Sequence, residues 1–168
     1  HPPEQLVGGM ESELIKYARR RATYCAGTTH PVSFNQLHLL LFHVLAPESS
    51  VYNWALTMWL QGAVCVHALR AALQELVRRH AVMRTSFDFD SSGDFVQRVH
   101  APTNGELLLQ EQTDAASDEA AEELAYADAN RPYELFNQDS PVLRCLLVQV
   151  AGSERSLLQI AMHHVARD

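Results

Sequence analysis

The sequence predicts an α+β fold, with a mostly antiparallel or mixed sheet and three or four helices. Segments with the helical spacing of apolar residues alternate with apolar runs of strand length, and turn-forming residues separate them. The chain has 168 residues, of which 47% are hydrophobic and 20% are charged. This composition is typical of a globular protein, and the length is sufficient for one core of ordinary size.

The predicted helices cover residues 10–25, 33–45, 66–80 and 117–130. The first has only moderate apolar periodicity, whereas the third carries the clearest helical pattern. Ser33 and Ser117 are favourable N-caps for the second and the fourth. The second helix is apolar on nearly all sides, so we expect it to be buried.

The predicted strands cover residues 53–61, 83–89, 95–100, 106–112, 142–150 and 156–162. The first has apolar side chains on both faces, which favours a central position in a sheet. The segment from Asp90 to Asp94 contains a glycine and predicts a hairpin between the second and third strands. Gly152 and its neighbours predict another hairpin between the last two.

Charge and composition narrow the class of partner. A formal net charge of -7 argues against nucleic acid. No apolar stretch approaches the roughly 18 residues of a membrane span, and we see no secretory signal.

The 3 cysteines are far apart, which favours reduced thiols in a cytoplasmic protein. The basic cluster from Lys16 to Arg21 is typical of a solvated helix face, or less often of a docking patch. Both ends are expected to be cut from a longer polypeptide.

The last six residues contain two adjacent histidines, His163 and His164, and then Asp168. They follow a predicted strand, and reactive side chains often lie where strands end. An imidazole can act as a base near neutral pH, and a carboxylate can fix a loop by pairing with a cation. Adjacent residues leaving a strand point in opposite directions, so only one histidine is expected to face a substrate. A divalent metal on His164 and Asp168 would need a third ligand, which the sequence does not provide, so no metal site is expected.

Five segments, in order, resemble the N-terminal half of a nonribosomal peptide synthetase condensation domain, in the chloramphenicol-acetyltransferase-like superfamily. They are Ser33–Leu40 (S-x-A-Q-x-R-L-W in the family), Val51–Gly62, Arg79–Phe87 (R-H-E-x-L-R-T-x-F), Arg131–Arg144 and Met162–Asp168 (M-H-H-x-x-x-D-G). The resemblance covers residues 31–168. Ala81 replaces a glutamate of the family, and Arg167 lies where a small residue is usual.

The resemblance implies half of a pseudo-dimer. Residues 1–30 would be a linker and an entry helix, and residues 31–168 the N-terminal subdomain, with the C-terminal half absent. In this family an amine on one carrier protein attacks an acyl or peptidyl thioester on another and forms an amide. No cofactor is bound directly, because the substrates are carried on phosphopantetheine arms. The expected partners are these carrier domains and the missing half of the domain.

The resemblance also implies roles for site residues. His164 is expected to be catalytic, either as a base or as a hydrogen-bonding anchor, and His163 to be structural. Asp168 is expected to fix the loop by pairing with Arg79, or with Arg84 as the second choice. Without its other half, the fragment is expected to be inactive.

Two other functions remain open from the sequence. One is a non-catalytic carrier-docking or product-release module of a polyketide synthase or hybrid megaenzyme. The other is a relative that transfers an acyl group to an alcohol with the same histidine loop. Domains that follow in the parent chain would separate these interpretations.

Overall fold

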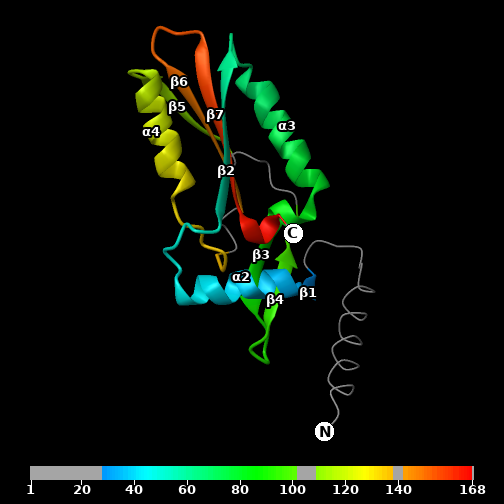
Figure 1. Cartoon of the computed structure of the whole chain (residues 1–168). Helices are drawn as coiled ribbons and strands as arrows, with labels where there is room; N and C mark the ends of the chain where they lie inside the picture. The colour runs from blue at the N-terminus through cyan, green and yellow to red at the C-terminus, as the bar shows by residue number, and fades with distance from the viewer. Residues whose placement is uncertain (1–27, 102–108, 138–141, 168) are drawn as a thin grey trace, which may run out of the picture.

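The computed structural model describes residues 28–101, 109–137 and 142–167 (Figure 1). The elements in order are β1 (Thr29–Pro31), α2 (Phe34–Leu45), β2 (Asn53–Gln61), α3 (Val66–Arg79), η1 (Ala81–Arg84), β3 (Thr85–Phe89), β4 (Phe95–Val99), β5 (Leu109–Ala115), α4 (Asp118–Ala129), β6 (Leu143–Val150), β7 (Arg155–His163) and η2 (His164–Ala166). This α+β content confirms the predicted fold class. The predicted helix over 10–25 lies outside the described residues.

The larger sheet has the strand order β2-β7-β6-β5. The strands β2 and β6 each pair antiparallel with β7, and β5 pairs parallel to β6, so the sheet is mixed, as predicted. The helices α3 and α4 lie on opposite faces of it (Figure 1). Along β6, Cys145 and Leu147 share a core cluster with α3, whereas Leu146 and Val148 share one with α4. The alternation of side chains along a strand explains this division.

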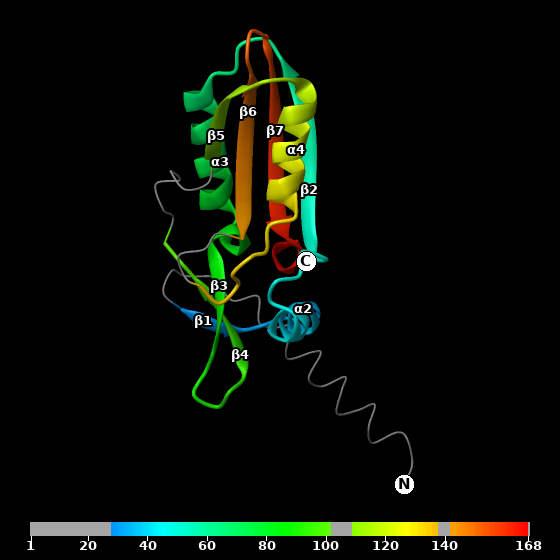
Figure 2. The same cartoon turned by 90° about the vertical axis from the view of Figure 1, so that its left-hand side faces the viewer.

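The prediction of a central position for β2 is wrong. Within the described residues β2 pairs only with β7 and forms an edge of the sheet (Figure 2). Its middle residues are exposed, and Leu56 retains 44% of its accessible surface. Apolar residues on both faces of a strand predict that both faces can be covered by other elements. They do not specify how many strands pair with it through hydrogen bonds.

The smaller sheet is antiparallel, with the strand order β1-β4-β3. The predicted hairpin is confirmed, although Met83 and Arg84 belong to the 3-10 turn η1 instead of to β3. Gly93 has φ +83°, a left-handed conformation that glycine adopts without steric cost. The Asp90 carboxylate accepts hydrogen bonds from the backbone N–H groups of Ser92 and Asp94 and so closes the turn.

The helix α2 begins as predicted. The Ser33 hydroxyl accepts from the Gln36 N–H at 3.1 Å, and the Gln36 side chain accepts from the Ser33 N–H at 2.8 Å, which completes a capping box. The expectation that the whole helix is buried is wrong. Leu40 is fully buried, but Leu45 is 84% exposed, and Phe34, Leu41 and Val44 are exposed as well. Composition predicts the apolar character of a helix, whereas burial depends on which faces have neighbours.

A third core cluster joins the two sheets. It combines Leu40 of α2, Phe87 of β3, Tyr133 and Leu135 after α4, and Val165 of η2. Figure 2 shows α2 and the smaller sheet beyond the end of the larger sheet where β7 terminates. The histidine segment therefore lies at this junction. No helix in the described ranges is long and apolar enough to cross a bilayer.

Candidate functional site

The strand β7 ends at His163, and the 3-10 turn η2 begins at the next residue. The two adjacent histidines lie in different environments. His163 is 3% exposed, whereas the side chain of His164 is exposed to solvent. Val165 and Ala166 are buried and hold the turn against the core, while the His164 imidazole remains exposed to solvent.

Aromatic rings surround His163. The centroid of its ring lies 5.9 Å from that of Tyr133, 6.1 Å from that of His43 and 6.4 Å from that of Tyr52. Burial, together with repulsion from His43 and His164, lowers the pKa of His163 to about 4. Burial also lowers the pKa of His43, against a smaller opposing effect of Glu48. Both buried imidazoles are therefore neutral at pH 7.

Hydrogen bonds fix the backbone of the turn. The Val165 N–H donates to Nδ1 of His163 at 3.1 Å, so His163 serves as the N-cap of η2. The His164 N–H donates to the Tyr52 carbonyl at 2.8 Å, and the Arg167 N–H donates to the His164 carbonyl at 3.0 Å. An Nδ1 atom that accepts carries no proton, so a neutral His163 holds its proton on Nε2.

The surface beside His164 carries a cation and an aromatic ring. The Arg167 guanidinium lies 5.0 Å from the centroid of the Trp54 ring, a cation–π contact. Arg167 is exposed, and residues three apart in a 3-10 turn lie on the same side. His164 and Arg167 are therefore neighbours on one exposed side of the turn.

The two candidate arginines differ in environment. Arg79 is exposed at the end of α3, and its Nε lies 2.6 Å from a carboxylate oxygen of Glu75. Arg84 in η1 is partly buried and donates from Nη1 to the His100 carbonyl. Its buried Nε has no hydrogen-bond partner in the described part of the chain. Asp168 lies outside the described residues, so its predicted pairing with either arginine stays a prediction.

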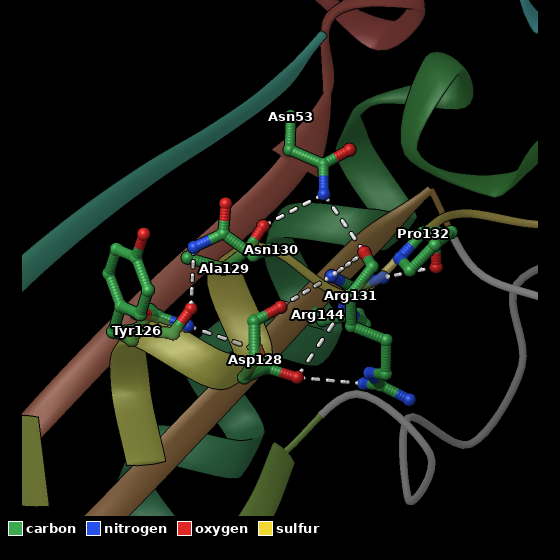
Figure 3. Close-up of polar contacts among 9 residues, drawn as sticks. Asn53, Tyr126, Asp128, Ala129, Asn130, Arg131, Pro132 and Arg144 are labelled. Atoms are coloured by element: carbon green, nitrogen blue, oxygen red, sulfur yellow. Dashed lines mark hydrogen bonds and ion pairs between the residues drawn. The ribbon is translucent and has the colours of Figure 1, made fainter. Parts of the chain in front are cut away.

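A polar network that the sequence reasoning missed connects β6 and β2 with the end of α4 (Figure 3). From β6, Nη2 of Arg144 donates to the carbonyls of Asp128 at 2.8 Å and Arg131 at 2.9 Å. From β2, Nδ2 of Asn53 donates to the carbonyls of Ala129 at 2.8 Å and Arg131 at 2.9 Å. These bonds reach backbone carbonyls at the end of α4, where a helix supplies few donors of its own, and the Asp128 carbonyl also accepts from the Arg131 N–H at 3.1 Å.

This network also contains an ion pair. The Arg144 Nε lies 3.6 Å from Asp128 Oδ1, and the other carboxylate oxygen accepts from Gln159 at 3.0 Å. The Arg144 guanidinium lies 3.8 Å from the centroid of the Tyr133 ring, which in turn contacts His163. Burial raises the pKa of Tyr133. A single charged residue within the long apolar run of β6 is the sequence signal that could have identified the network.

Among the described residues, no group of three His, Cys, Asp or Glu side chains is placed to hold a metal ion. Among the described residues of the turn, the exposed ionisable side chains are the His164 imidazole and the Arg167 guanidinium. The structure exposes the His164 ring and buries the His163 ring.

Comparisons with known proteins identify the family that the chain resembles. Residues 27–168 match the condensation domain family. The chain is 32% identical over 156 residues to one of the plipastatin synthase proteins of Bacillus subtilis (strain 168), covering 93% of this chain and 6% of that protein. It is 33% identical over 142 residues to one of the linear gramicidin synthase proteins of Brevibacillus parabrevis, covering 82% of this chain and 3% of that protein.

Solved condensation domains share the fold. The starter condensation domain of rhizomide synthetase superposes with a TM-score of 0.70 at 25% identity, over 82% of this chain and 34% of that one. The first condensation domain of the CDA synthetase gives 0.69 at 18% identity, over 82% of this chain and 36% of that one, which supports the fold alone. The chain therefore spans about a third of these structures.

Proposed function

The chain belongs to the condensation domain family, and we propose that in the complete protein it supplies the catalytic histidine of an amide-forming condensation domain. The relatives are components of peptide synthases, which favours a peptide synthetase as the parent. The substrates would be an acyl or peptidyl thioester and an aminoacyl thioester, each on the phosphopantetheine arm of a carrier domain. Because the chain spans about a third of the matched structures, turnover would require the rest of the domain.

One observation carries this proposal: His164 is exposed at the end of β7 while the turn beneath it is buried and hydrogen-bonded. The amine nitrogen would form a bond to the thioester carbon. A neutral His164 would orient the amine or accept its proton as the tetrahedral intermediate forms. Collapse would break the carbon–sulfur bond, and the released thiolate would take up the proton.

Asp168 would hold the loop through a charge pair, and Arg84 is the better supported partner. Its Nε is buried without a partner among the described residues, and Val82 of the same turn packs in the cluster that contains Val165. Arg79, the partner favoured by the sequence, is exposed and already paired with Glu75. An ion pair with a carboxylate stabilises a partly buried guanidinium more than an exposed one, because water screens the exposed pair.

The test is a His164→Ala substitution in the complete protein, with both carriers loaded. Loss of general-base catalysis is expected to lower amide formation by about 100-fold or more, with carrier loading unchanged. His67→Ala is the matched control, because His67 is exposed on α3, away from η2. Unchanged amide formation by His164→Ala would refute the assignment. Transfer to an alcohol but not to an amine would instead identify an O-acyltransferase.

A further inference from the structure

We propose that Arg167 determines substrate specificity, because its guanidinium binds a carboxylate on one of the two groups that the condensation joins. The substrate class is an acidic residue, an aspartyl or glutamyl group, on the donor or on the acceptor carrier. This inference rests on the proposed function of His164, since it places the carboxylate beside the reacting atoms.

The position of Arg167 follows from the turn η2. Arg167 is the C-cap of this turn, and its backbone N–H donates to the His164 carbonyl at 3.0 Å. Side chains three residues apart in a 3-10 turn eclipse one another, and a rise of about 2 Å per residue separates them by about 6 Å. Both side chains are exposed, whereas the two residues between them are buried. A substrate that reaches His164 from solvent therefore lies about one side-chain length from residue 167.

Trp54 holds the Arg167 side chain in place. The guanidinium carbon lies 5.0 Å from the centroid of the Trp54 ring, and Trp54 pairs with Met162 across β2 and β7. Figures 1 and 2 both show η2 beside this end of β2. A long side chain that is already directed by a ring loses less conformational entropy when it binds a ligand.

The Arg167 guanidinium remains available to an anion. A guanidinium that contacts an aromatic face keeps its N–H donors in its own plane, where they fit a carboxylate. Within the described ranges, the Arg167 side chain makes no ion pair or hydrogen bond. Other exposed arginines differ, since Arg79 pairs with Glu75 and Arg131 pairs with Asp128. The cation beside His164 is therefore not neutralised by these described side chains.

A side-chain carboxylate is the anion that suits this place. It is ionised at neutral pH, and it lies within a few bonds of the carbon that carries the reacting group. The phosphate of a carrier arm lies the length of the arm away from the thioester, so it does not reach the turn. Trp54 and Leu56 share one face of β2, and Leu56 is 44% exposed, so they offer apolar contact to the carbon stem of the acid.

The experiment uses the complete protein and thioesters that differ in charge but scarcely in shape. In the donor arm, the N-acetylcysteamine thioesters of N-acetyl-aspartate and N-acetyl-asparagine compete, because neither has a free amine and each can only donate. In the acceptor arm, the aspartyl and asparaginyl thioesters accept the same acetylglycyl donor. We expect kcat/KM to favour the charged member by about 10- to 100-fold in one arm, which identifies the carrier concerned.

Arg167→Met should reduce this preference to about onefold and change the rate with the uncharged member by less than about threefold. Arg78→Met is the matched control, because it removes the same charge at the exposed end of α3 and should keep the preference. A structural role of Arg167, or stabilisation of the tetrahedral intermediate, would lower the rates with both members equally. Such an equal loss would overturn the proposal.

Binding separates this proposal from the function of His164. Both pairs are titrated calorimetrically into the His164→Ala protein, where the aspartyl member should bind about tenfold more tightly until Arg167→Met is added. If His164→Ala is fully active, the proposed function fails, yet the difference in affinity still decides the specificity. The comparison needs no Arg167 variant, so it holds even if Arg167→Met does not fold. Charged members that bind no better than uncharged ones in either arm would overturn the proposal.

Discussion

Acidification is expected to destabilise the fold through His163. Its pKa is about 4 in the folded protein, against 6.5 for an unperturbed histidine, because of burial first and then of repulsion from His43 and His164. Between these two values the unfolded chain binds more protons than the folded one. The free energy of unfolding therefore falls as the pH decreases from about 6.5 to about 4, and His163 contributes no pH dependence above that range.

The size of this effect follows from the same two values. At about 1.4 kcal/mol per pH unit, the lowering from 6.5 to about 4 corresponds to about 3 kcal/mol of stability lost by pH 4. His43, whose pKa is lowered as well, changes stability in the same direction. A loss of this size is a large fraction of the stability of an ordinary domain.

The assay is urea unfolding of the complete condensation domain at a series of pH values from 4 to 7.5. The unmodified protein is compared with His163→Asn, which keeps an acceptor for Val165 but does not titrate. Carboxylates and His43 titrate in both proteins, so the difference between the two curves isolates His163. We expect the asparagine variant to lose about 3 kcal/mol less over this range. Parallel curves would refute the reasoning, because they would mean that His163 binds protons equally in both states.

Two further predictions concern arginines. Replacing Arg144 by methionine should cost about 1–3 kcal/mol in urea unfolding, since the Asp128 carboxylate and three carbonyls each lose one of their partners, whereas Arg78→Met at the exposed end of α3 should leave the melting temperature unchanged. A stable Arg144→Met protein would show that the network contributes little. The second prediction concerns the partner of Asp168: Arg84→Met should lower amide formation more than Arg79→Met does. The double variant Arg84→Met with Asp168→Asn should lose no more amide formation than either single variant. Additive losses would exclude a pair between Arg84 and Asp168.

Local signals located most elements correctly. The cap at Ser33 and the periodicity of residues 66–80 depend on neighbours within one or two turns, and α2 and α3 begin and end within a residue or two of the expected positions. The hairpin at Gly93 likewise depends on the conformation of a few residues. Such features are encoded in contiguous stretches of chain, so a single sequence is enough to find them.

The two wrong predictions about burial both concerned neighbours far away in the sequence. The strand β2 is an edge because only β7 pairs with it in the described residues, although its apolar pattern suits a covered strand. In α2, Leu40 packs in the core while Leu45 is exposed, although both are leucines of the same helix. The hydrophobicity of a side chain does not reveal which faces of its helix or strand pack against other elements.

The motif identified His163, His164 and Asp168 as a unit, but it could not assign a role to each atom. The cap from His163 Nδ1 to Val165 depends on where β7 ends and η2 begins. The ring of His43, more than a hundred residues earlier, reaches His163 only because α2 packs against η2. Arg144 and Tyr133 likewise meet only in the folded chain.

The sequence alone determined the fold class, most of the elements and the histidine segment, because caps, periodicity and motifs are properties of neighbouring residues. The tertiary structure decided that His163 is buried and neutral while His164 is exposed, and that Arg79 pairs with Glu75 while Nε of Arg84 is buried without a partner among the described residues. Burial, protonation and pairing depend on groups that only folding brings together, since desolvation and hydrogen bonding act over a few ångströms in space regardless of separation along the chain.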